Sequence, residues 1–406
     1  MNQREIANTI NELIDISVKN ERFVNDSKLP SKSFGIGEGN VSFIGFDEVS
    51  KYQTGLEHLY QQNQEVEQTI SLKKFESSLI DLIRTLRDSS SKCEYKDFKN
   101  LTAKLLEPEN QESEILYELF GCEMQSDNLE LGDFTLYNFP KAENLLIKKY
   151  PPLQYREIYF NRRKSDILLG VKVKARENNK SVELADELVE TFENVMNYMI
   201  ADLSHQRSVG IFNFRGWKIT RRVICNNSSM GFHGSNDISL PVKIEDPFFQ
   251  DDSQGNDKIW QLITKSNKSE IEKRLLQAIE WIGKGVYDKD KSKSLVQLVF
   301  AIEGMLQHDH KTLITPSIVS QLSDWLAFII HDDATKRRQI AKYFKQTYRK
   351  RSAIVHGGDK AIDIKDVQIA LQISKLMVIA FLTTDPFNKM KTVQKLNEYI
   401  TELKFK

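Results

Sequence analysis

The sequence predicts a mainly α-helical protein in which a small α/β domain separates an N-terminal helical region from a C-terminal helical bundle. Apolar residues recur at helical spacing in the first hundred residues and again, almost without interruption, after residue 256. Between these regions, segments 155–175 and 209–225 alternate and are rich in β-branched and aromatic residues, as strands are. A length of 406 residues also exceeds that of one ordinary domain.

The N-terminal region, residues 1–104, is expected to be mostly helical. One apolar stripe predicts a short helix over residues 1–20, formed by Ile6, Ile10, Leu13, Ile14 and Val18. Helical periodicity returns over residues 56–88. The loop-rich segment between them contains three glycines, Gly35, Gly37 and Gly39. Their spacing matches neither the dinucleotide-binding nor the Walker pattern, so we interpret the segment as a turn or hairpin.

The middle region, residues 105–250, is expected to be the α/β domain. Besides the two strand-like segments, SLPVKI (239–244) has strand character. Residues 181–203 form an amphipathic helix in the prediction, with one apolar face made of Leu184, Leu188, Phe192, Val195, Met199 and Leu203.

The C-terminal region, residues 256–406, is expected to be a helical bundle. The acidic, glycine-bearing segment 246–258 is typical of a linker. Helical periodicity then predicts six segments, at about 258–286, 293–308, 315–331, 335–356, 363–383 and 388–403. Short connections between long amphipathic helices imply antiparallel neighbours.

The composition predicts a cytoplasmic protein with reduced cysteines and without a membrane anchor. Its 57 basic and 57 acidic residues give no net charge, so a polyanionic partner must be argued from local patches. Three widely spaced cysteines argue against a disulfide framework or a zinc ribbon: Cys93, Cys122 and Cys225. The longest apolar run, 376–382, is far shorter than the roughly 20 residues that a membrane span requires.

The segment KRRQIAKYFKQTYRKRSAIVHGG carries the strongest functional signal. From Lys336 to Arg351 it holds eight basic residues and no acidic one, which is either a solvated helix face or a binding surface. On a helical wheel Arg351 lies within an apolar stripe and Arg349 lies opposite it. The stripe consists of Ile340, Phe344, Thr347, Ile354 and Val355. Because a guanidinium among apolar residues is costly unless an anion meets it, Arg351 is a functional candidate.

His356 and Glu303 complete the candidate site. His356 ends the helix just before Gly357 and Gly358, where the helix dipole favours the protonated ring and Arg351 disfavours it. Such a histidine suits proton transfer; the alternative is that it only caps backbone carbonyls. Glu303 lies inside an apolar arc of its own helix and requires a cation, either Arg351, His356 or a surface lysine.

The six residues from Arg351 to His356 fit the RxxxxH motif of the HEPN superfamily, and YRKRSAIVHGG resembles its Apea-like branch. Upstream, RLLQAIEWIGKGVYDKDKSKSLVQLVFAIEGML is similar to the opening helices of that branch, including Trp281 and the Glu303 position. The resemblance covers about residues 256–385 and does not extend to residues 1–250.

The resemblance implies a metal-independent endoribonuclease without a cofactor. HEPN nucleases are helical bundles that commonly dimerise, so that two motifs meet in one cleft. His356 would act on the ribose 2′-hydroxyl, Arg351 would bind the scissile phosphate, and the products would be 2′,3′-cyclic phosphate and 5′-hydroxyl ends. Glu303 would orient the pair. Further RNA contacts are expected from Lys345, Tyr348, Lys350 and Ser352, the last in a position where active members often carry Asn, Asp or His.

By the same resemblance, the protein is expected to be an anti-phage abortive-infection effector that cuts RNA, with transfer RNA among the candidate targets. Residues 1–250 would sense a trigger, such as a phage-derived one. Two alternatives stay open: a catalytically silent HEPN module that binds RNA or a protein, and the toxin of a toxin–antitoxin pair.

Other histidines and basic residues are weaker candidates for a functional site. His308, His310 and His331 lack the paired helical spacing of metal ligands, so no metal is expected. His233 lies in a glycine-bearing turn, where a structural role is expected. Two groups of basic residues, at 162–164 and 221–222, could extend an RNA-binding surface. Alternatively, they are solvent-exposed ends of strands.

Overall fold

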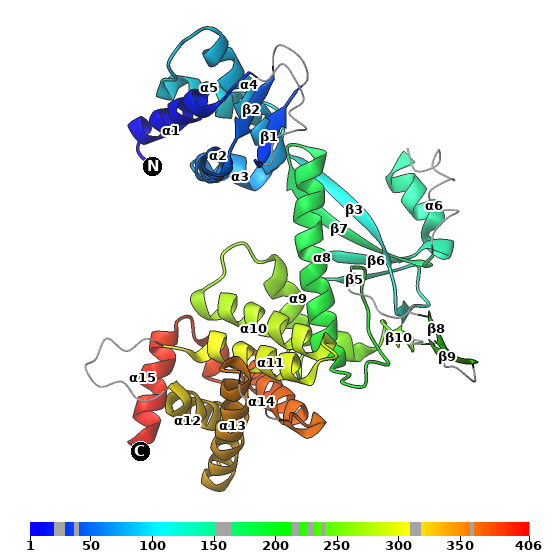
Figure 1. Ribbon diagram of the computed structural model, residues 1–406. Helices are drawn as coiled ribbons and strands as arrows, with labels where there is room; N and C mark the ends of the chain where they lie inside the picture. The colour runs from blue at the N-terminus through cyan, green and yellow to red at the C-terminus, as the bar shows by residue number, and fades with distance from the viewer. Residues whose placement is uncertain are drawn as a thin grey trace. The chain divides into compact units, whose positions relative to one another are not determined.

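The computed structural model describes residues 1–19, 29–35, 40–151, 164–212, 219–225, 230–236, 240–308, 318–357 and 361–405, with the backbone alone for 219–225 and 230–236 (Figure 1). The described chain is mainly helical with a small proportion of sheet, as predicted. It divides into two compact units. One comprises Met1–Ile115 and Lys172–Asp186, and the other comprises Leu116–Val171 and Glu187–Lys406.

The first unit begins with five helices and a two-stranded antiparallel hairpin. The helices are α1 (Gln3–Ile16), α2 (Phe46–Tyr60), α3 (Gln64–Thr69), α4 (Leu72–Asp88) and α5 (Tyr95–Leu106). The strands are β1 (Ser31–Phe34) and β2 (Val41–Ile44). The predicted hairpin is therefore confirmed, although its loop with Gly37 and Gly39 lies outside the described residues.

Helix caps and aromatic packing stabilise the first unit. Asn2 starts α1 with a capping box, and Ser71 caps α4. Tyr52 stacks on Phe43 at a ring distance of 4.2 Å inside one apolar core. The prediction that the first helix extends to residue 20 is wrong, because the chain leaves the helix after Ile16 and Val18 pairs with strand residue Ser42.

A four-stranded sheet forms the middle of the chain, in the order β3-β7-β6-β5. Its strands are β3 (Gln111–Leu119), β5 (Asn128–Leu131), β6 (Phe134–Asn138) and β7 (Ile167–Ala175), and β6 runs antiparallel to β5 and to β7. Two smaller pairs accompany it: β4 (Cys122–Glu123) with β10 (Val242–Lys243), and β8 (Ile219–Cys225) with β9 (Met230–Asn236). The predicted strand segments thus contain β7, β8 and β10.

Two helices lie in the described residues of this region, α6 (Phe139–Lys149) and α8 (Asn178–Ile200). The predicted helix 181–203 matches α8, which packs through Phe192 against Phe134 of β6 at a ring distance of 5.1 Å. The division into domains at 104/105 and 250/256 stays a prediction. The two units cut across residues 105–250, since β3, β7 and α8 each pass from one unit to the other.

Seven helices form the described C-terminal bundle: α9 (Asn256–Thr264), α10 (Glu270–Tyr287), α11 (Lys291–Leu306), α12 (Ile318–Ile330), α13 (Ala334–Val355), α14 (Ile364–Thr383) and α15 (Val393–Lys404). They follow the six predicted segments, except that 258–286 is divided between α9 and α10, because Ser269 begins α10 with a capping box. Helix α13 packs against α12, α11 and α14 (Figure 1).

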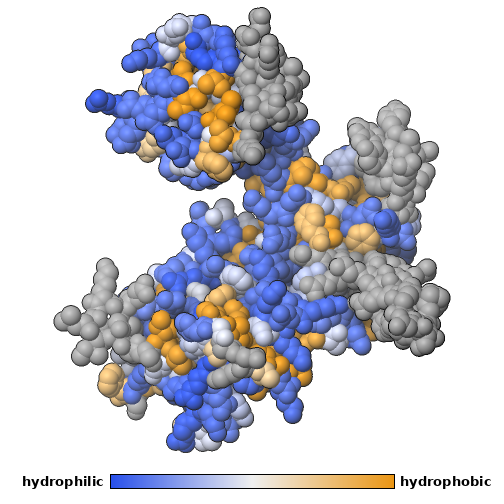
Figure 2. All heavy atoms as spheres, viewed as in Figure 1, coloured by the Kyte–Doolittle hydropathy of each residue, from blue (hydrophilic) through white to orange (hydrophobic). Residues whose placement is uncertain are grey.

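Helix α14 is long and apolar enough to cross a bilayer by length and composition, and more than half of its most apolar window is buried in the protein. It contacts α10, α11, α12 and α13, as the central helix of a soluble bundle does. Figure 2 shows that the outside of the chain on the visible face is mostly hydrophilic, with apolar residues in scattered patches.

Candidate functional site

Helix α13 carries most of the predicted site. Asp333 caps its start by accepting from the backbone N–H groups of Thr335 and Lys336. Its fully buried residues are Phe344 and Thr347. Val355, at the end of the predicted apolar stripe, is 53% exposed, so the stripe leaves the bundle core in the last turn of the helix.

Arg351 and Glu303 form an ion pair between α13 and α11. The Nη2 atom of Arg351 lies 2.9 Å from Oε2 of Glu303, and the two side chains are 17% and 14% exposed. Arg351 is thus the cation that Glu303 meets, among the candidates that the sequence left open. At this depth the pair is poorly screened by water, and breaking it leaves a charge without its partner.

Aromatic rings surround the guanidinium. Its central carbon lies 5.0 Å from the ring centre of Phe300 and 5.5 Å from that of Tyr348. The buried Nε atom of Arg351 has no hydrogen-bond partner in the described structure. Phe300 was missed by the sequence reasoning; its position one turn before Glu303 was the available signal.

Tyr348 joins the pair through its hydroxyl. Burial, together with the hydrogen bond and the negative charge of Glu303, raises the pKa of Tyr348, while the positive charge of Arg351 opposes that rise. The phenol therefore remains a protonated donor throughout the neutral range. Tyr348 and Arg351 converge on the carboxylate of Glu303.

His356 is the C-cap residue of α13, and Gly357 follows it in the left-handed conformation at φ 74°. The backbone N–H of His356 donates to the carbonyl of Ser352 at 3.1 Å. The exposed imidazole makes no hydrogen bond with another described residue. It lies five positions after Arg351, which at helical spacing is a rotation of about 140° around the axis, so we infer that the two side chains lie on different faces of α13.

A ridge along α13 connects the remaining candidates. Lys345, Tyr348, Ser352 and His356 follow one another at spacings of three, four and four residues, which puts them in one row on a helix surface. Lys345, Tyr348 and Ser352 are half-buried and His356 is exposed. We call this row the α13 ridge. It starts at Lys345, meets the Arg351–Glu303 pair at Tyr348 and ends at the imidazole of His356.

Lys350 lies apart from the ridge. Its Nζ atom is 2.5 Å from Oδ2 of Asp366 on α14, across a groove of about 510 Å³ to which Tyr343 and Arg349 also contribute. This groove runs between α13 and α14, on the other side of the helix from Tyr348. The structure thus does not bring Lys350 together with the other predicted RNA contacts.

The remaining candidate histidines, where the structure describes them, contact neighbouring side chains or the backbone. His308 stacks on Trp325, and Nδ1 of His331 accepts from the backbone N–H of Asp333. His310, Arg162 and Arg163 lie outside the described residues, as do the side chains of 221–222 and His233. Among the described residues no three metal-ligating side chains cluster.

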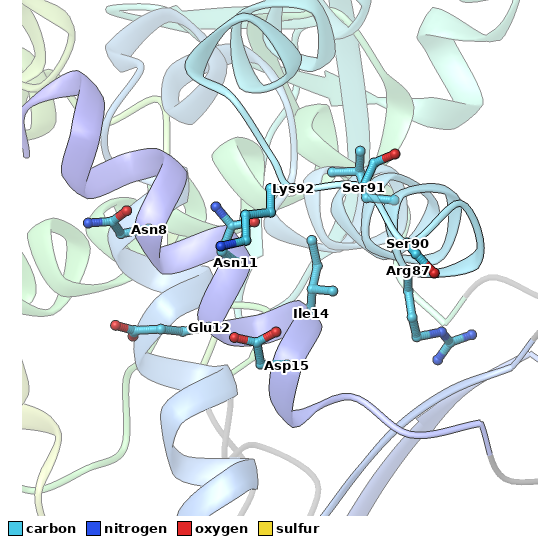
Figure 3. Close-up of a pocket in the computed structure, with 10 residues that line it drawn as sticks. Asn8, Asn11, Glu12, Ile14, Asp15, Arg87, Ser90, Ser91 and Lys92 are labelled. Carbon is cyan, nitrogen blue, oxygen red and sulfur yellow. The ribbon is translucent and has the colours of Figure 1, made fainter.

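A polar hollow in the first unit was not anticipated from the sequence (Figure 3). It has a volume of about 600 Å³ and lies between α1 and the turn after α4. Glu12 and Asp15 line one side, and Arg87 and Lys92 line the other. Asn11 both donates to and accepts from the backbone of Cys93, which holds that turn against α1.

Comparison with protein-family models, with curated proteins and with solved structures found no match to this chain.

Proposed function

We propose that the C-terminal bundle is a metal-independent endoribonuclease of the HEPN type, which leaves 2′,3′-cyclic phosphate and 5′-hydroxyl ends. One observation carries the proposal. A largely buried guanidinium, Arg351, is held by Glu303 and two aromatic rings beside the half-buried α13 ridge, which ends in the exposed imidazole of His356. The RxxxxH motif and its sequence setting support the same assignment.

The chemistry needs a base and a cation at one phosphodiester. His356 takes the proton of the 2′-hydroxyl as its oxygen attacks the adjacent phosphorus. The new P–O bond forms while the bond to the 5′-oxygen breaks, and that oxygen gains a proton. Arg351 stabilises the negative charge that grows on the phosphate oxygens. Since the two side chains lie on different faces of α13, an RNA strand would have to bridge them, or the two groups would come from two copies.

The second arrangement fits the dimer that the HEPN resemblance implies. Mixing Arg351→Ala chains with His356→Ala chains tests it, because a composite site regains cleavage in mixed dimers. No recovery in mixtures that sedimentation shows to be dimeric would assign both groups to one chain.

A silent HEPN module is the second candidate. It is favoured by the Arg351–Glu303 pair itself, since a guanidinium that already has a carboxylate partner 2.9 Å away is neutralised without RNA. In this function the pair holds α11 against α13, and the bundle binds RNA or a protein. The proposal also includes an anti-phage role, a phage-derived trigger and a cytoplasmic location, with a toxin of a toxin–antitoxin pair as the alternative. Experiments in cells test these parts.

The deciding experiment uses the purified full-length chain, total cellular RNA and transfer RNA, with a chelator present. We expect cleavage to cyclic-phosphate ends, and a loss of about a hundredfold or more in His356→Ala. Arg349→Ala is the matched control, because this exposed arginine lies on the same helix and away from the pair. If the RNA stays uncut in all samples, with and without phage lysate, the nuclease proposal is rejected and the binding function replaces it.

A further inference from the structure

The polar hollow of the first unit contains charged groups of both signs that are not paired with one another. Glu12 and Asp15 extend from α1, Arg87 extends from the last turn of α4, and Lys92 extends from the connection between α4 and α5 (Figure 3). No ion pair joins either carboxylate to either cation in the described part of the chain. We call these four residues the charged rim of the hollow.

The acidic side of the charged rim is electrostatically unfavourable as it stands. Glu12 and Asp15 lie three positions apart on α1, so two negative charges are neighbours on one helix surface. Asp15 also lies in the last turn of α1, which contains no basic residue, and the helix dipole disfavours a carboxylate there. Lys19, the nearest basic residue along the chain, pairs with Asp88 at 3.0 Å instead. A bound cation would relieve both effects.

The basic side of the charged rim has unused hydrogen-bond donors. Arg87 donates through Nη2 to the carbonyl of Asn40 at 2.9 Å and through Nε to Asp88 at 3.4 Å. Its side chain is only 13% exposed, and the buried Nη1 atom has no hydrogen-bond partner. Lys92 is exposed and forms no ion pair with any residue that the structure describes. A carboxylate, with two acceptor oxygens, could accept from both of these cations.

The hollow has the size of a small-molecule site and some apolar surface. Its volume of about 600 Å³ lies within the range of roughly 300–1,000 Å³ that such sites occupy. Half-buried Ile14 and Leu86 contribute aliphatic surface to the lining. A purely cationic ligand would leave the basic side of the charged rim without an anion, and a purely anionic ligand would leave the acidic side without a cation. A ligand with one ammonium, one carboxylate and an aliphatic group matches the whole lining.

We propose that the hollow binds a small zwitterion of the free α-amino acid class with an aliphatic side chain. The ammonium meets the acidic side of the charged rim, the carboxylate meets the basic side, and the side chain packs on Ile14 and Leu86. Because the rim has two charges of each sign, a neutral zwitterion complements it without leaving a net charge. The inference is independent of the proposed nuclease, whose residues belong to the second unit.

The test is calorimetric titration of the full-length chain with L-leucine and with two analogues that each lack one charge. The first, 3-methylbutylamine, has the same aliphatic group and the ammonium but no carboxylate. The second, 4-methylpentanoate, has the carboxylate but no ammonium. We expect saturable binding of L-leucine, and binding of each analogue that is weaker by about tenfold or more, because each loses one set of charge-assisted hydrogen bonds.

Two charge-removing variants assign the two ends of the ligand. Glu12→Gln combined with Asp15→Asn should weaken L-leucine by about tenfold and should not weaken 4-methylpentanoate, which has no ammonium. Lys92→Met should weaken L-leucine and 4-methylpentanoate but not 3-methylbutylamine. Misfolding would weaken all three ligands together, so a loss confined to the expected ligands comes from the contact itself.

Matched controls make the same charge changes elsewhere in the first unit. Glu57→Gln and Lys51→Met alter exposed residues of α2 outside the hollow and should leave all three affinities unchanged. Thermal unfolding provides a second control. The combined Glu12→Gln and Asp15→Asn chain should unfold at no lower temperature than the parent, since it loses two neighbouring like charges.

The inference is overturned if L-leucine does not bind. It is overturned as well if either analogue binds as tightly as L-leucine, which would make the hollow a simple cation or anion site. Unchanged L-leucine affinity in the combined Glu12→Gln and Asp15→Asn chain would place the ligand elsewhere and also reject the inference. None of these results bears on RNA cleavage by the second unit.

Discussion

Among single residues, Glu303 has the greatest influence on the candidate site. Its carboxylate accepts from Tyr348 and pairs with Arg351, so it fixes the position of a phenol and of a guanidinium together. If Arg351 left this pair, the half-buried carboxylate of Glu303 would lose its cationic partner. An RNA phosphate that binds Arg351 must therefore share the guanidinium with Glu303.

The Glu303→Gln substitution keeps the side-chain shape and removes the charge. We expect it to reduce RNA cleavage by more than tenfold, because the neutral amide offers Arg351 and Tyr348 one acceptor oxygen in place of a charged carboxylate with two, and to lower the free energy of unfolding by only about 1–2 kcal/mol. Urea unfolding and a cleavage assay on the same sample measure both effects. Asp366→Asn is the matched control, since it breaks the Lys350 pair on the other side of α13. Equal losses in stability and activity for Glu303→Gln would show a purely structural ion pair.

Lys375 is a half-buried cation of α14 that the proposed chemistry does not use. Burial lowers the pKa of Lys375 to about 8, although its ammonium lies 5.0 Å from the Tyr198 ring centre and donates to the carbonyl of Met199. Because the pKa is lower in the folded state, protonation opposes folding below about pH 8. Stability should rise with pH from about 8 to about 10, where the unfolded chain binds the extra proton.

The Lys375→Met substitution should therefore stabilise the protein at pH 7, by up to about 3 kcal/mol, and flatten the pH dependence of unfolding between pH 8 and pH 10. Chemical denaturation at several pH values measures this difference. Lys365→Met, at the exposed start of the same helix, is the control and should leave the pH profile unchanged. A destabilised Lys375→Met chain would mean that its hydrogen bond to α8 outweighs the cost of burial.

At the level of the element, α13 combines two faces with different partners. One face holds Phe344, Thr347 and Arg351 against the bundle, and the ridge from Lys345 to His356 runs along its edge. Local capping by Asp333 and termination at Gly357 fix its length, so the imidazole ends the ridge. In the proposed function, an RNA backbone contacts this ridge at Lys345 and His356.

Lys345→Ala should weaken RNA binding and lower the slope of log affinity against log salt concentration by about 0.7, the contribution of one phosphate contact on a single strand. The rate of cleavage at saturating RNA should not change, since Lys345 takes no part in proton transfer. Binding measured across a salt series provides the slope. Lys350→Ala, whose cation already pairs with Asp366, is the control. Identical slopes for the parent and Lys345→Ala would show that the ridge is ordinary solvated surface.

For the whole molecule, the division into two units predicts separate unfolding. The first unit has its own apolar core, which includes the fully buried Leu79. The tryptophans among the described residues, Trp260, Trp281 and Trp325, belong to the second unit. Tryptophan fluorescence therefore reports on one unit, and far-ultraviolet circular dichroism reports on both.

Leu79→Ala should lower the stability of the first unit by about 2–5 kcal/mol, through lost burial and the cavity that remains. The circular dichroism transition should then begin at lower denaturant, while the fluorescence midpoint stays where it is in the parent chain. A shift of both midpoints by the same amount would show that the two units unfold as one cooperative structure.

The sequence by itself determined the helices of the bundle and the hairpin near residue 40. Helix periodicity, polar caps and glycine stops act within a few residues, so the bounds of α11, α13 and α14 follow from local chemistry. The same local argument placed Arg351 toward the core and Arg349 toward solvent, as the structure has them.

Only the tertiary structure decided which residues meet. The sheet order β3-β7-β6-β5 joins segments far apart in the chain, and no local periodicity encodes it. The partner of Glu303, the separation of Lys350 from the ridge, the exposure of Val355 and the contact between Phe300 and Trp281 all depend on how α10, α11, α13 and α14 pack. The physical reason is that the position of a residue along its own helix fixes the direction of its side chain. The packing of the neighbouring helices decides which residues that side chain contacts.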